Sequence, residues 1–412
     1  MHVLLITQYF PPEIGAAATR WGDYLKILNK KGHRVTVLCE MPNYPLGEYF
    51  PGYKREWVRQ ERISPNLTII RTFAWANNRK TTIKKLGHYI VFMLSGFINA
   101  IKIKNYDLMI ISSPPLFVGA IGAVLAKFRS FNFFLDVRDL WPESVIVLGE
   151  VKSRWVFNIG KKLESLIYNS TTGYIFPVPG FKKYFKKEFS SQLKKPMISL
   201  INGVSEEFIK LSRRYDRQPD EKFMVLYSGN IGLAQGLDTI LQVAKLLQNN
   251  PIDFLFVGNG VKLETLIVKT RKMNLNNVSF MPSQKKEDLV QIIKKSSVCL
   301  VPLKNKPLFR NAIPSKTFEY MACGRPVIVS VSGEIEKIIK IAKSGLIAQP
   351  EDANSIAESI MYYYNNKGRI QTHGENGVMY VNANVHKEIL ISDALIKIPH
   401  MNPSNSSFEN MN

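Results

Sequence analysis

The stretch that decides the fold class is MHVLLITQYFPPEIGAAATRWGDYLKILNKKGHRVTVLC, residues 1–39. It contains an apolar run at His2–Thr7, a loop with prolines and a glycine, a helical pattern over Ala17–Lys30 and a second apolar run at Arg34–Cys39. Gly32 is suited to end the helix. A strand, a helix and a strand in this order predict a parallel βαβ unit.

The same alternation continues along the chain. In the first half, strand-like runs lie at Leu67–Arg71, Leu108–Ser112 and Phe133–Val137. In the second half the pattern restarts, with runs at Phe223–Ser228, Asp253–Val257, Val278–Met281, Val298–Pro302 and Pro326–Ser330. Short apolar strands between longer helices are typical of a parallel sheet covered on both faces. We therefore expect an α/β protein with two doubly wound Rossmann-like domains that face each other across a cleft, where strand ends would bind ligands.

The join between the two domains is predicted from composition, because residues 193–205 interrupt the periodic pattern. We expect a first domain over residues 1–198 and a second over 199–369. A C-terminal segment over 370–398 follows, for which a return to the first domain is one option. Residues 399–412 are polar and are expected to form a flexible tail.

The charge balance is strongly basic. The 412 residues include 55 Lys and Arg against 33 Asp and Glu, a net charge of +22. Residues 1–200 hold 29 basic and 13 acidic residues, so +16 of this excess lies in the first half. Such a field attracts nucleic acid, anionic lipid or phosphorylated ligands, although a basic surface that only confers solubility is an alternative. No nucleic-acid-binding motif is recognisable, so we expect no nucleic-acid partner.

Cysteine usage and the first residues indicate the compartment. Cys39, Cys299 and Cys323 are few and lack metal-ligand spacing, which favours a reducing environment and argues against a disulfide framework. The N-terminal residues lack the basic region of a secretory signal. Histidines and carboxylates show no metal-ligand pattern either, so we expect a cytoplasmic protein without a bound metal.

One apolar segment, Leu86–Ile103, is flanked by basic residues: Arg79, Lys80, Lys84, Lys85, Lys102 and Lys104. A spanning helix needs ~20 apolar residues, and this segment is shorter and contains three polar side chains. Two alternatives remain: a buried amphipathic helix, or a helix in the membrane interface with its lysines on the headgroups. In the second case residues 79–104 would attach the protein to the cytoplasmic face of the cell membrane.

Three predicted strand-to-helix turns are rich in small residues that would let a diphosphate approach the backbone. The first follows His2–Thr7, the second is SGNIGLAQG (Ser228–Gly236) and the third ends the run Asp253–Val257. None matches G-x-G-x-x-G, so ordinary turns are the alternative. The residues that we predict to bind a nucleotide here are Gly15, Gly229, Asn230, Gln235, Gly236, Gly258 and Gly260.

The most informative stretch is PSKTFEYMACGRPVI, Pro314–Ile328. Ser315 is suited to cap a helix, and the free amides of Ser315–Phe318, aided by Lys316, could bind a pyrophosphate. Glu319 lies one turn into this helix, where its carboxylate can accept hydrogen bonds from both ribose hydroxyls. The alternative is a capped surface helix whose Glu319 only favours the dipole. The residues added to the predicted donor site are Arg310, Asn311, Ser315, Lys316, Thr317 and Glu319.

Charged residues cluster after Phe133–Val137, in the stretch DVRDLWPE (Asp136–Glu143). Acid–base work on an acceptor hydroxyl needs such a group within hydrogen-bond reach. We predict Arg138, Asp139 and Glu143 as the catalytic group. An Arg138–Asp136 pair that only locks the loop is the alternative.

These motifs resemble those of family 4 glycosyltransferases with the GT-B fold. Within that family the chain is similar to the bacterial N-acetyl-L-fucosamine transferases of O-antigen and capsule assembly. The stretches that carry the resemblance are Ile6–Arg20, Gly32–Tyr53, Asp136–Ser144, Tyr227–Leu241 and Pro314–Ile328. They lie in the expected order and cover the chain from its start to about residue 365.

The resemblance implies a retaining, metal-independent hexosyltransferase that acts in lipopolysaccharide, O-antigen or capsule biosynthesis. It would transfer an N-acetylated amino sugar from a UDP-sugar, held mainly by the second domain, to a polyprenyl-diphosphate-linked glycan on the first. It needs no cofactor besides the donor. Glu319 matches the ribose-binding carboxylate of the family's E-x7-E motif, and Gly15 matches a glycine near the diphosphate. A UDP-sugar 2-epimerase of the same fold and a basic nucleic-acid-binding protein are the alternatives.

The chain departs from the family pattern at three places. The earlier glutamate of E-x7-E falls at Asn311, and Asn230 and Gln235 stand where many relatives have the Arg and Lys that bind the diphosphate. The frequent first-domain histidine is not visible in the sequence. The positive charge on the phosphates is then left to Lys316, Arg310 or the helix amides.

Overall fold

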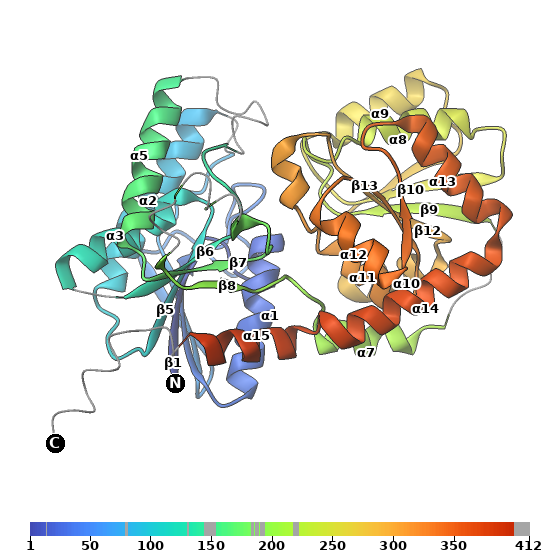
Figure 1. Ribbon diagram of the computed structural model, residues 1–412. Helices are drawn as coiled ribbons and strands as arrows, with labels where there is room; N and C mark the ends of the chain where they lie inside the picture. The colour runs from blue at the N-terminus through green and yellow to red at the C-terminus, as the bar shows by residue number, and fades with distance from the viewer. Residues whose placement is uncertain are drawn as a thin grey trace. The chain divides into compact units, whose positions relative to one another are not determined.

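The computed structural model describes residues 1–13, 15–78, 81–129, 132–143, 154–182, 185, 189, 194–216 and 222–398. The chain divides into two compact units, each an α/β structure (Figure 1). Unit 1 comprises Met1–Ile201 and Glu388–Asn412, and unit 2 comprises Asn202–Lys387. The predicted tail, 399–412, and two of the basic residues near the apolar segment, Arg79 and Lys80, lie outside the described residues.

Unit 1 is built on an eight-stranded sheet with the order β3-β4-β2-β1-β5-β6-β7-β8. Its strands are β1 (His2–Ile6), β2 (Arg34–Glu40), β3 (Val58–Ser64), β4 (Leu67–Thr72), β5 (Leu108–Ser113), β6 (Phe133–Val137), β7 (Gly173–Phe176) and β8 (Met197–Ser199). All neighbours are parallel except β3 and β4, which form a hairpin. Because β1 pairs with both β2 and β5, the chain reverses its direction of travel across the sheet at β1. Ligands bind at such switch points in doubly wound sheets.

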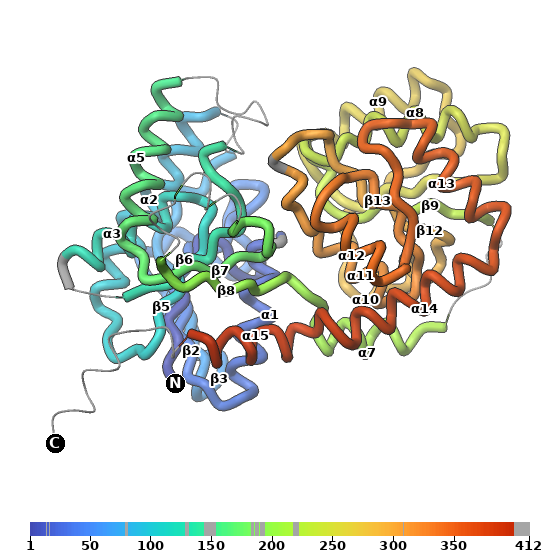
Figure 2. Tube along the Cα trace, in the orientation of Figure 1, coloured from blue at the N-terminus to red at the C-terminus, as the bar shows by residue number. Residues whose placement is uncertain are grey.

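Helices cover both faces of this sheet. One face packs against α1 (Ala16–Lys30) and α15 (Lys387–Lys397), which lie side by side in Figure 2. Apolar residues of both helices, such as Trp21 and Ile391, share one buried core with Val3 and Val37 of the strands. The opposite face packs against α2 (Thr82–Ala100) and α3 (Leu116–Arg129), and α5 (Arg154–Ser170) packs against α3.

Helix α2, which contains most of the apolar segment, buries a largely polar side. The residues it buries include His88, Ser95 and Asn99. The Ser95 hydroxyl donates to the carbonyl of Phe73 at 2.8 Å, so the polar groups of this side are hydrogen bonded. Among the described helices, none combines the length and the hydrophobicity that spanning a bilayer requires.

Unit 2 is built on a six-stranded, all-parallel sheet with the order β11-β10-β9-β12-β13-β14. Its strands are β9 (Phe223–Ser228), β10 (Ile252–Val257), β11 (Val278–Met281), β12 (Val298–Pro302), β13 (Val327–Ser330) and β14 (Gly345–Ile347). The central strand β9 lies between β10 and β12, so the switch point falls at β9. The prediction of a second parallel α/β sheet is therefore confirmed.

Helices also cover both faces of this second sheet (Figure 1). On one face, α8 (Leu237–Leu246), α9 (Leu263–Lys272) and α13 (Ala353–Asn365) enclose a core with Val225, Phe254 and Leu300 of the strands. The other helical elements of unit 2 are α7 (Glu206–Arg214), α10 (Lys286–Lys295), the 3-10 turn η2 (Pro307–Asn311), α11 (Lys316–Ala322), α12 (Glu334–Ala342) and α14 (Lys367–Asn384). Helix α14 packs against α11.

The unit boundaries differ in detail from the predicted domains. The chain passes from unit 1 to unit 2 after Ile201, where the predicted boundary was residue 198. It returns to unit 1 at Glu388, whereas the predicted C-terminal segment began at residue 370. Residues of α14 stay with unit 2 because two glycines bring this helix close to α11. A Cβ at Gly374 would lie 2.1 Å from the carbonyl oxygen of Gly324, and one at Gly377 would lie 3.1 Å from the Met321 side chain.

Candidate active site

The predicted donor-binding residues of unit 2 gather at the carboxyl edge of its sheet. Residues 229–236 follow the end of β9, and residues 258–260 follow the end of β10. The turn η2 and the start of α11 come after β12, the neighbour of β9 on the other side. These segments therefore meet at the switch point, where parallel sheets bind ligands.

The two glycine-rich loops pack against each other. The amide of Gly229 donates to the carbonyl of Val257 at 2.8 Å, and the amide of Ile231 donates to that of Asn259 at 2.8 Å. A Cβ at Gly258 would lie 1.9 Å from the Gly229 carbonyl oxygen, and both glycines of the second loop have positive φ. Packing between the loops thus explains Gly258 and Gly260 without any direct ligand contact.

Gln235 and Asn230 shape the first loop from within. The Gln235 side-chain oxygen accepts a hydrogen bond from the Gly232 amide at 3.1 Å. The backbone carbonyl of Asn230 accepts one from the Tyr227 hydroxyl at 2.5 Å. Gly236 has φ 62° and precedes α8, a position that favours glycine. Several main-chain amides of this loop therefore donate hydrogen bonds within the protein. The expected loop would instead leave its amides open to a diphosphate.

Helix α11 is fastened to the end of β9 by Tyr320. The buried Tyr320 hydroxyl accepts a hydrogen bond from the Ser228 amide at 2.7 Å and lies 3.0 Å from the Ser228 hydroxyl. Burial raises the pKa of this phenol, so it stays a neutral partner. Glu319, the preceding residue, is only partly buried. The helix thus holds this carboxylate at the sheet edge and outside the core.

The start of α11 differs from the predicted cap. Ser315 has helical backbone angles (φ −58°, ψ −31°), and its side chain makes no capping hydrogen bond in the described structure. The amides of Thr317 and Phe318 are not free, because they donate to the carbonyls of Pro314 and Ser315. A turn that begins at Pro314 satisfies these groups locally, so two of the four expected anion-binding amides are occupied.

Lys316 carries a positive charge to the end of β9. Its ammonium lies 3.9 Å from the centroid of the Tyr227 ring. Burial lowers the pKa of Lys316 to about 7, against the opposing effect of the Glu319 carboxylate. An anionic ligand beside this ammonium would favour its protonated form. Lys316 was predicted from the sequence, but Tyr227 was not. The available signal for Tyr227 was an aromatic residue at the end of a predicted strand.

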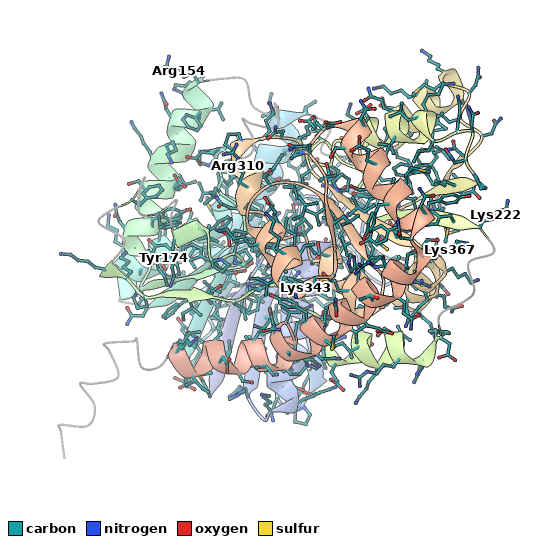
Figure 3. All side chains as sticks on the ribbon, turned by 45° about the vertical axis from the view of Figure 1, so that its right-hand side comes forward. Arg154, Tyr174, Lys222, Arg310, Lys343 and Lys367 are labelled. Carbon is teal, nitrogen blue, oxygen red and sulfur yellow. The ribbon has the colours of Figure 1, made fainter. Side chains whose placement is uncertain are left out.

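The turn η2 contributes the two remaining predicted donor residues of unit 2. Arg310, labelled in Figure 3, is exposed, and Asn311 is partly buried. The chain approaches this turn closely at Gly333, where a Cβ would lie 2.0 Å from the Arg310 carbonyl oxygen. Gly333 has φ 114°, so glycine is required there, and its contact fixes the backbone of Arg310.

In unit 1, Asp136 is the centre of a buried network. It is fully buried and accepts hydrogen bonds from Arg20 at 3.1 Å, Trp21 at 2.8 Å and Ser112 at 2.9 Å. These partners come from α1 and β5, so the carboxylate joins the helix to the strand ends. A buried charge held in this way is a structural anchor.

The three predicted catalytic residues make different contacts in unit 1. Arg138 donates to the Pro114 carbonyl at 2.6 Å and lies 3.9 Å from Asp136, and burial lowers its pKa. Glu143 accepts a hydrogen bond from Lys161 of α5 at 2.7 Å. Asp139 is partly buried, and its backbone carbonyl accepts from the Trp141 amide. The geometry of Arg138 fits the loop-locking alternative, and Glu143 is tied to a helix.

A second buried network lies under the loops that follow β1 and β2. Glu13 accepts hydrogen bonds from the amides of Asn43 and Tyr44, both at 2.9 Å. Burial, reinforced by the charge of Glu40, raises the pKa of Glu13 to about 8. Glu40 in turn lies 3.2 Å from the imidazole of His88. No residue was assigned from the sequence to the family's frequent first-domain histidine. His88 lies 48 residues from Glu40, and no local pattern pairs it with these acids.

Gly15 lies in the same edge of unit 1 and is partly buried. A Cβ there would meet only the Tyr44 ring, at 3.9 Å, which is ordinary contact. Local packing therefore does not demand glycine at this position, unlike Gly258 in unit 2. Space beside the backbone remains for a ligand.

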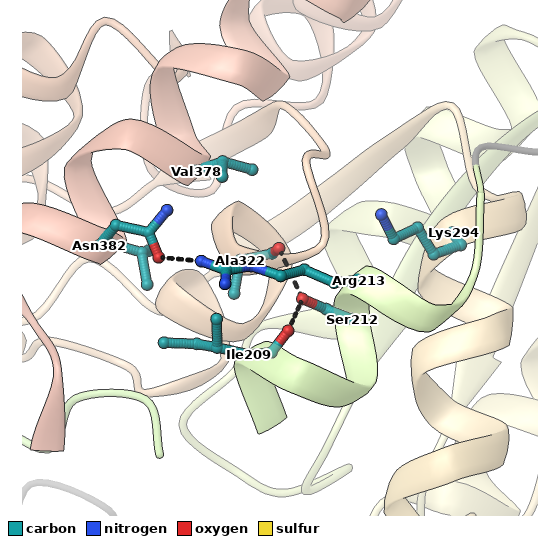
Figure 4. Close-up of a pocket in the computed structure, with 8 residues that line it drawn as sticks. Ile209, Ser212, Arg213, Lys294, Ala322, Val378 and Asn382 are labelled. Atoms are coloured by element: carbon teal, nitrogen blue, oxygen red, sulfur yellow. Dashed lines mark hydrogen bonds between the residues drawn. The ribbon is translucent and has the colours of Figure 1, made fainter. Parts of the chain in front are cut away.

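The described residues contain no group of three or more His, Cys, Asp or Glu side chains placed to hold a metal ion. A small pocket of about 100 Å³ lies between α7, α11 and α14 (Figure 4). In it Arg213 donates to Asn382, and the Ser212 hydroxyl donates to the Ala322 carbonyl. Its described lining includes none of the predicted donor residues.

Comparison with known proteins identifies similar sequences. Residues 209–378 match the family model "Glycosyl transferases group 1". The chain is 23% identical over 351 residues to the putative colanic acid biosynthesis glycosyl transferase WcaI of Escherichia coli K12, covering 82% of this chain and 84% of that one.

Two solved structures share the fold. Sucrose-phosphate synthase from Thermosynechococcus elongatus superposes with a TM-score of 0.78 at 20% identity, covering 97% of this chain and 98% of that one. HepE from Anabaena, solved in complex with UDP, superposes with a TM-score of 0.68 at 12% identity, covering 97% and 100%. The fold class is thus confirmed as GT-B. Residues 209–378 of unit 2 resemble group 1 glycosyl transferases, and the chain is a glycosyltransferase.

Proposed function

We propose that the chain is a retaining glycosyltransferase that moves a sugar from a UDP-sugar to a polyprenyl-diphosphate-linked glycan in O-antigen or capsule biosynthesis. N-acetyl-L-fucosamine is the sugar that its sequence resemblance favours. The relative WcaI is described as a colanic acid biosynthesis enzyme, which supports a role in polysaccharide assembly. HepE binds UDP on the same fold, which supports UDP as the nucleotide.

One observation carries this proposal: the anchoring of α11 beside the end of β9. The Tyr320–Ser228 hydrogen bonds place Glu319 and Lys316 on the same short helix at the switch point. Glu319 would accept hydrogen bonds from the ribose hydroxyls. The Lys316 ammonium and the loop that contains Gly229 would lie against the diphosphate.

The chemistry then follows from charge. When the sugar–phosphate bond breaks, negative charge develops on the leaving diphosphate, and a preorganised cation stabilises it. Lys316 would supply this charge, with Arg310 available on the neighbouring turn. The acceptor hydroxyl would enter on the face that the diphosphate leaves, and its proton would pass to the leaving phosphate. The alternative destination for this proton is the Asp139 carboxylate of unit 1, which the sequence predicts as an acid–base residue.

A membrane partner fits the outer surface of unit 1. Helix α2 exposes Ile83 (81%), Leu94 (54%) and Ile98 (41%). It buries the polar residues His88, Ser95 and Asn99. Helix α5 exposes Trp155 (73%), and exposed Lys84 and Lys102 lie near the two ends of α2. Apolar side chains between cations suit the interface of an anionic bilayer. We propose that this surface binds the inner face of the cell membrane.

Sedimentation with liposomes tests the membrane partner. Wild type should bind vesicles that contain phosphatidylglycerol and bind phosphatidylcholine vesicles weakly. Leu94→Glu should reduce binding, whereas Leu246→Glu, at a similarly exposed apolar position on α8, should not. Equal binding by both variants would contradict the proposal.

A donor screen tests the activity. UDP-, GDP- and dTDP-sugars are compared for thermal stabilisation, because a ligand at 100 times its Kd adds ~2.7 kcal/mol. The best donor is then incubated with polyprenyl-diphosphate-linked N-acetylglucosamine, and products are analysed by mass spectrometry. Sugar transfer with retained anomeric configuration supports the proposal. Epimerisation of the free nucleotide sugar without an acceptor would refute it in favour of an epimerase.

A further inference from the structure

The buried face of Tyr227 is the starting point. Tyr227 is 1% exposed and is the penultimate residue of β9. Its hydroxyl donates to the backbone of Asn230, so its ring is held in place by the loop that follows the strand. The Lys316 ammonium lies over this ring, 3.9 Å from its centroid. The negative face of an aromatic ring attracts a cation in this position.

Gly229 provides the space for this contact. A Cβ at Gly229 would lie 2.8 Å from the Lys316 nitrogen and 3.1 Å from its terminal carbon. Gly229 also has φ 124°, a conformation that favours glycine. The ammonium is therefore seated between the ring of Tyr227 and the bare backbone of Gly229, at the end of the central strand.

The loop beside this ammonium position contains no charged side chain between Gly229 and Gly236. Its polar residues Asn230 and Gln235 are neutral, and the Gln235 oxygen is bound to the Gly232 amide. A diphosphate at this strand end thus needs a cation from another element. Lys316 comes from α11, which Tyr320 fastens to the same strand.

We propose that Tyr227 is a positioning residue whose ring holds the Lys316 ammonium at the end of β9 to receive the donor diphosphate. This inference rests on the proposed function, because it takes a nucleoside diphosphate as the ligand. Tyr227 itself does not touch the reacting atoms. It acts through the place it gives to Lys316.

The surroundings of the Lys316 ammonium also make UDP binding depend on pH. The groups that face the ammonium are the Tyr227 ring and Gly229 backbone from β9 and its loop, and Glu319 from α11. With its pKa at about 7, Lys316 loses its proton above neutral pH in the free protein. A bound diphosphate favours the charged form, so binding takes up a proton. UDP affinity should therefore fall as the pH rises above 7.

Calorimetric titration with UDP between pH 6.5 and 9 tests this role. The wild type should lose affinity by up to about 10-fold per pH unit above pH 7, as proton linkage requires. Lys316→Met should bind UDP weakly at pH 7 and show a flat profile. Tyr227→Phe keeps the ring and should stay within about 3-fold of wild type, whereas Tyr227→Leu should bind about 5–10-fold more weakly.

A double variant separates positioning from general damage. If the ring acts through Lys316, Tyr227→Leu should add nothing to Lys316→Met. Tyr363→Leu, at another buried tyrosine of unit 2, controls for loss of stability and should leave UDP affinity unchanged. If Tyr227→Leu does not fold, the pH profiles of Lys316→Met and Tyr227→Phe still decide the question.

Three results would overturn the inference. They are wild-type affinity in Tyr227→Leu, additive losses in the double variant, or a Phe variant as weak as the Leu variant. Each leaves the proposed function standing if the wild type binds UDP. A wild-type protein that fails to bind UDP at millimolar concentration would overturn the function and the inference together.

Discussion

Replacing Tyr320 by Phe removes one hydroxyl group from the junction between α11 and β9. That hydroxyl accepts a hydrogen bond from the Ser228 amide at 2.7 Å, and both groups are buried. The variant leaves a buried amide without its partner, which costs ~1–3 kcal/mol. A domain of this size loses roughly 2–4 °C in Tm for each kcal/mol. Because the junction also places Lys316 and Glu319, UDP affinity should fall with stability.

Urea unfolding followed by circular dichroism measures the stability, and calorimetry measures the affinity for UDP. Tyr363→Phe is the matched control, because it removes another tyrosine hydroxyl of unit 2, one that lies 2.7 Å from His373. The control should lose stability but keep UDP affinity. A Tyr320→Phe variant with wild-type stability, or with reduced stability and unchanged affinity, would refute the proposed role of the junction.

Three further predictions concern the framework of the two units. Gly258→Ala should lower the free energy of unfolding by about 2–4 kcal/mol, because its Cβ would lie 1.9 Å from the Gly229 carbonyl oxygen. A loss below about 1 kcal/mol in thermal unfolding would contradict this. Asp136→Ala should lose about 3–5 kcal/mol by leaving the buried Arg20 charge unpaired, and a stable variant in urea would disprove the anchor. The folded-state pKa of Glu13 lies above its ordinary value, so wild-type stability should fall by more than ~1 kcal/mol as the pH rises from about 5 through 8. Glu13→Gln should remove that part of the pH dependence, and an unchanged profile in urea titrations would speak against the shifted pKa.

The βαβ order could be predicted because strand and helix periodicities differ strongly in this chain. His2–Thr7 is buried on both faces and reads as a continuous apolar run, which is typical of a parallel strand. The β3 strand, Val58–Ser64, was not expected. It is an edge strand with mostly polar side chains, so it carries no apolar signal.

The site was predicted as a set of residues, but not as an arrangement. Gly258 was chosen for a ligand contact, yet its neighbour in space is the Gly229 carbonyl, which no local pattern reveals. Pairings such as Tyr227 with Lys316 or Glu13 with Asn43 join residues far apart in the chain. Composition and spacing locate strand ends, but tertiary packing decides which polar groups are already satisfied there.

The central claim is that the Glu319 carboxylate binds the ribose of a uridine nucleotide. Calorimetry with UDP and 2′-deoxy-UDP, on wild type and Glu319→Ala, tests it most directly, with Glu334→Ala as a control at another partly buried glutamate of unit 2. A hydrogen bond to a charged group contributes about 1.5–3 kcal/mol, so wild type and Glu334→Ala should prefer UDP at least about 10-fold. Glu319→Ala should bind both nucleotides equally. A Glu319→Ala variant that still prefers UDP as strongly as wild type would contradict the claim.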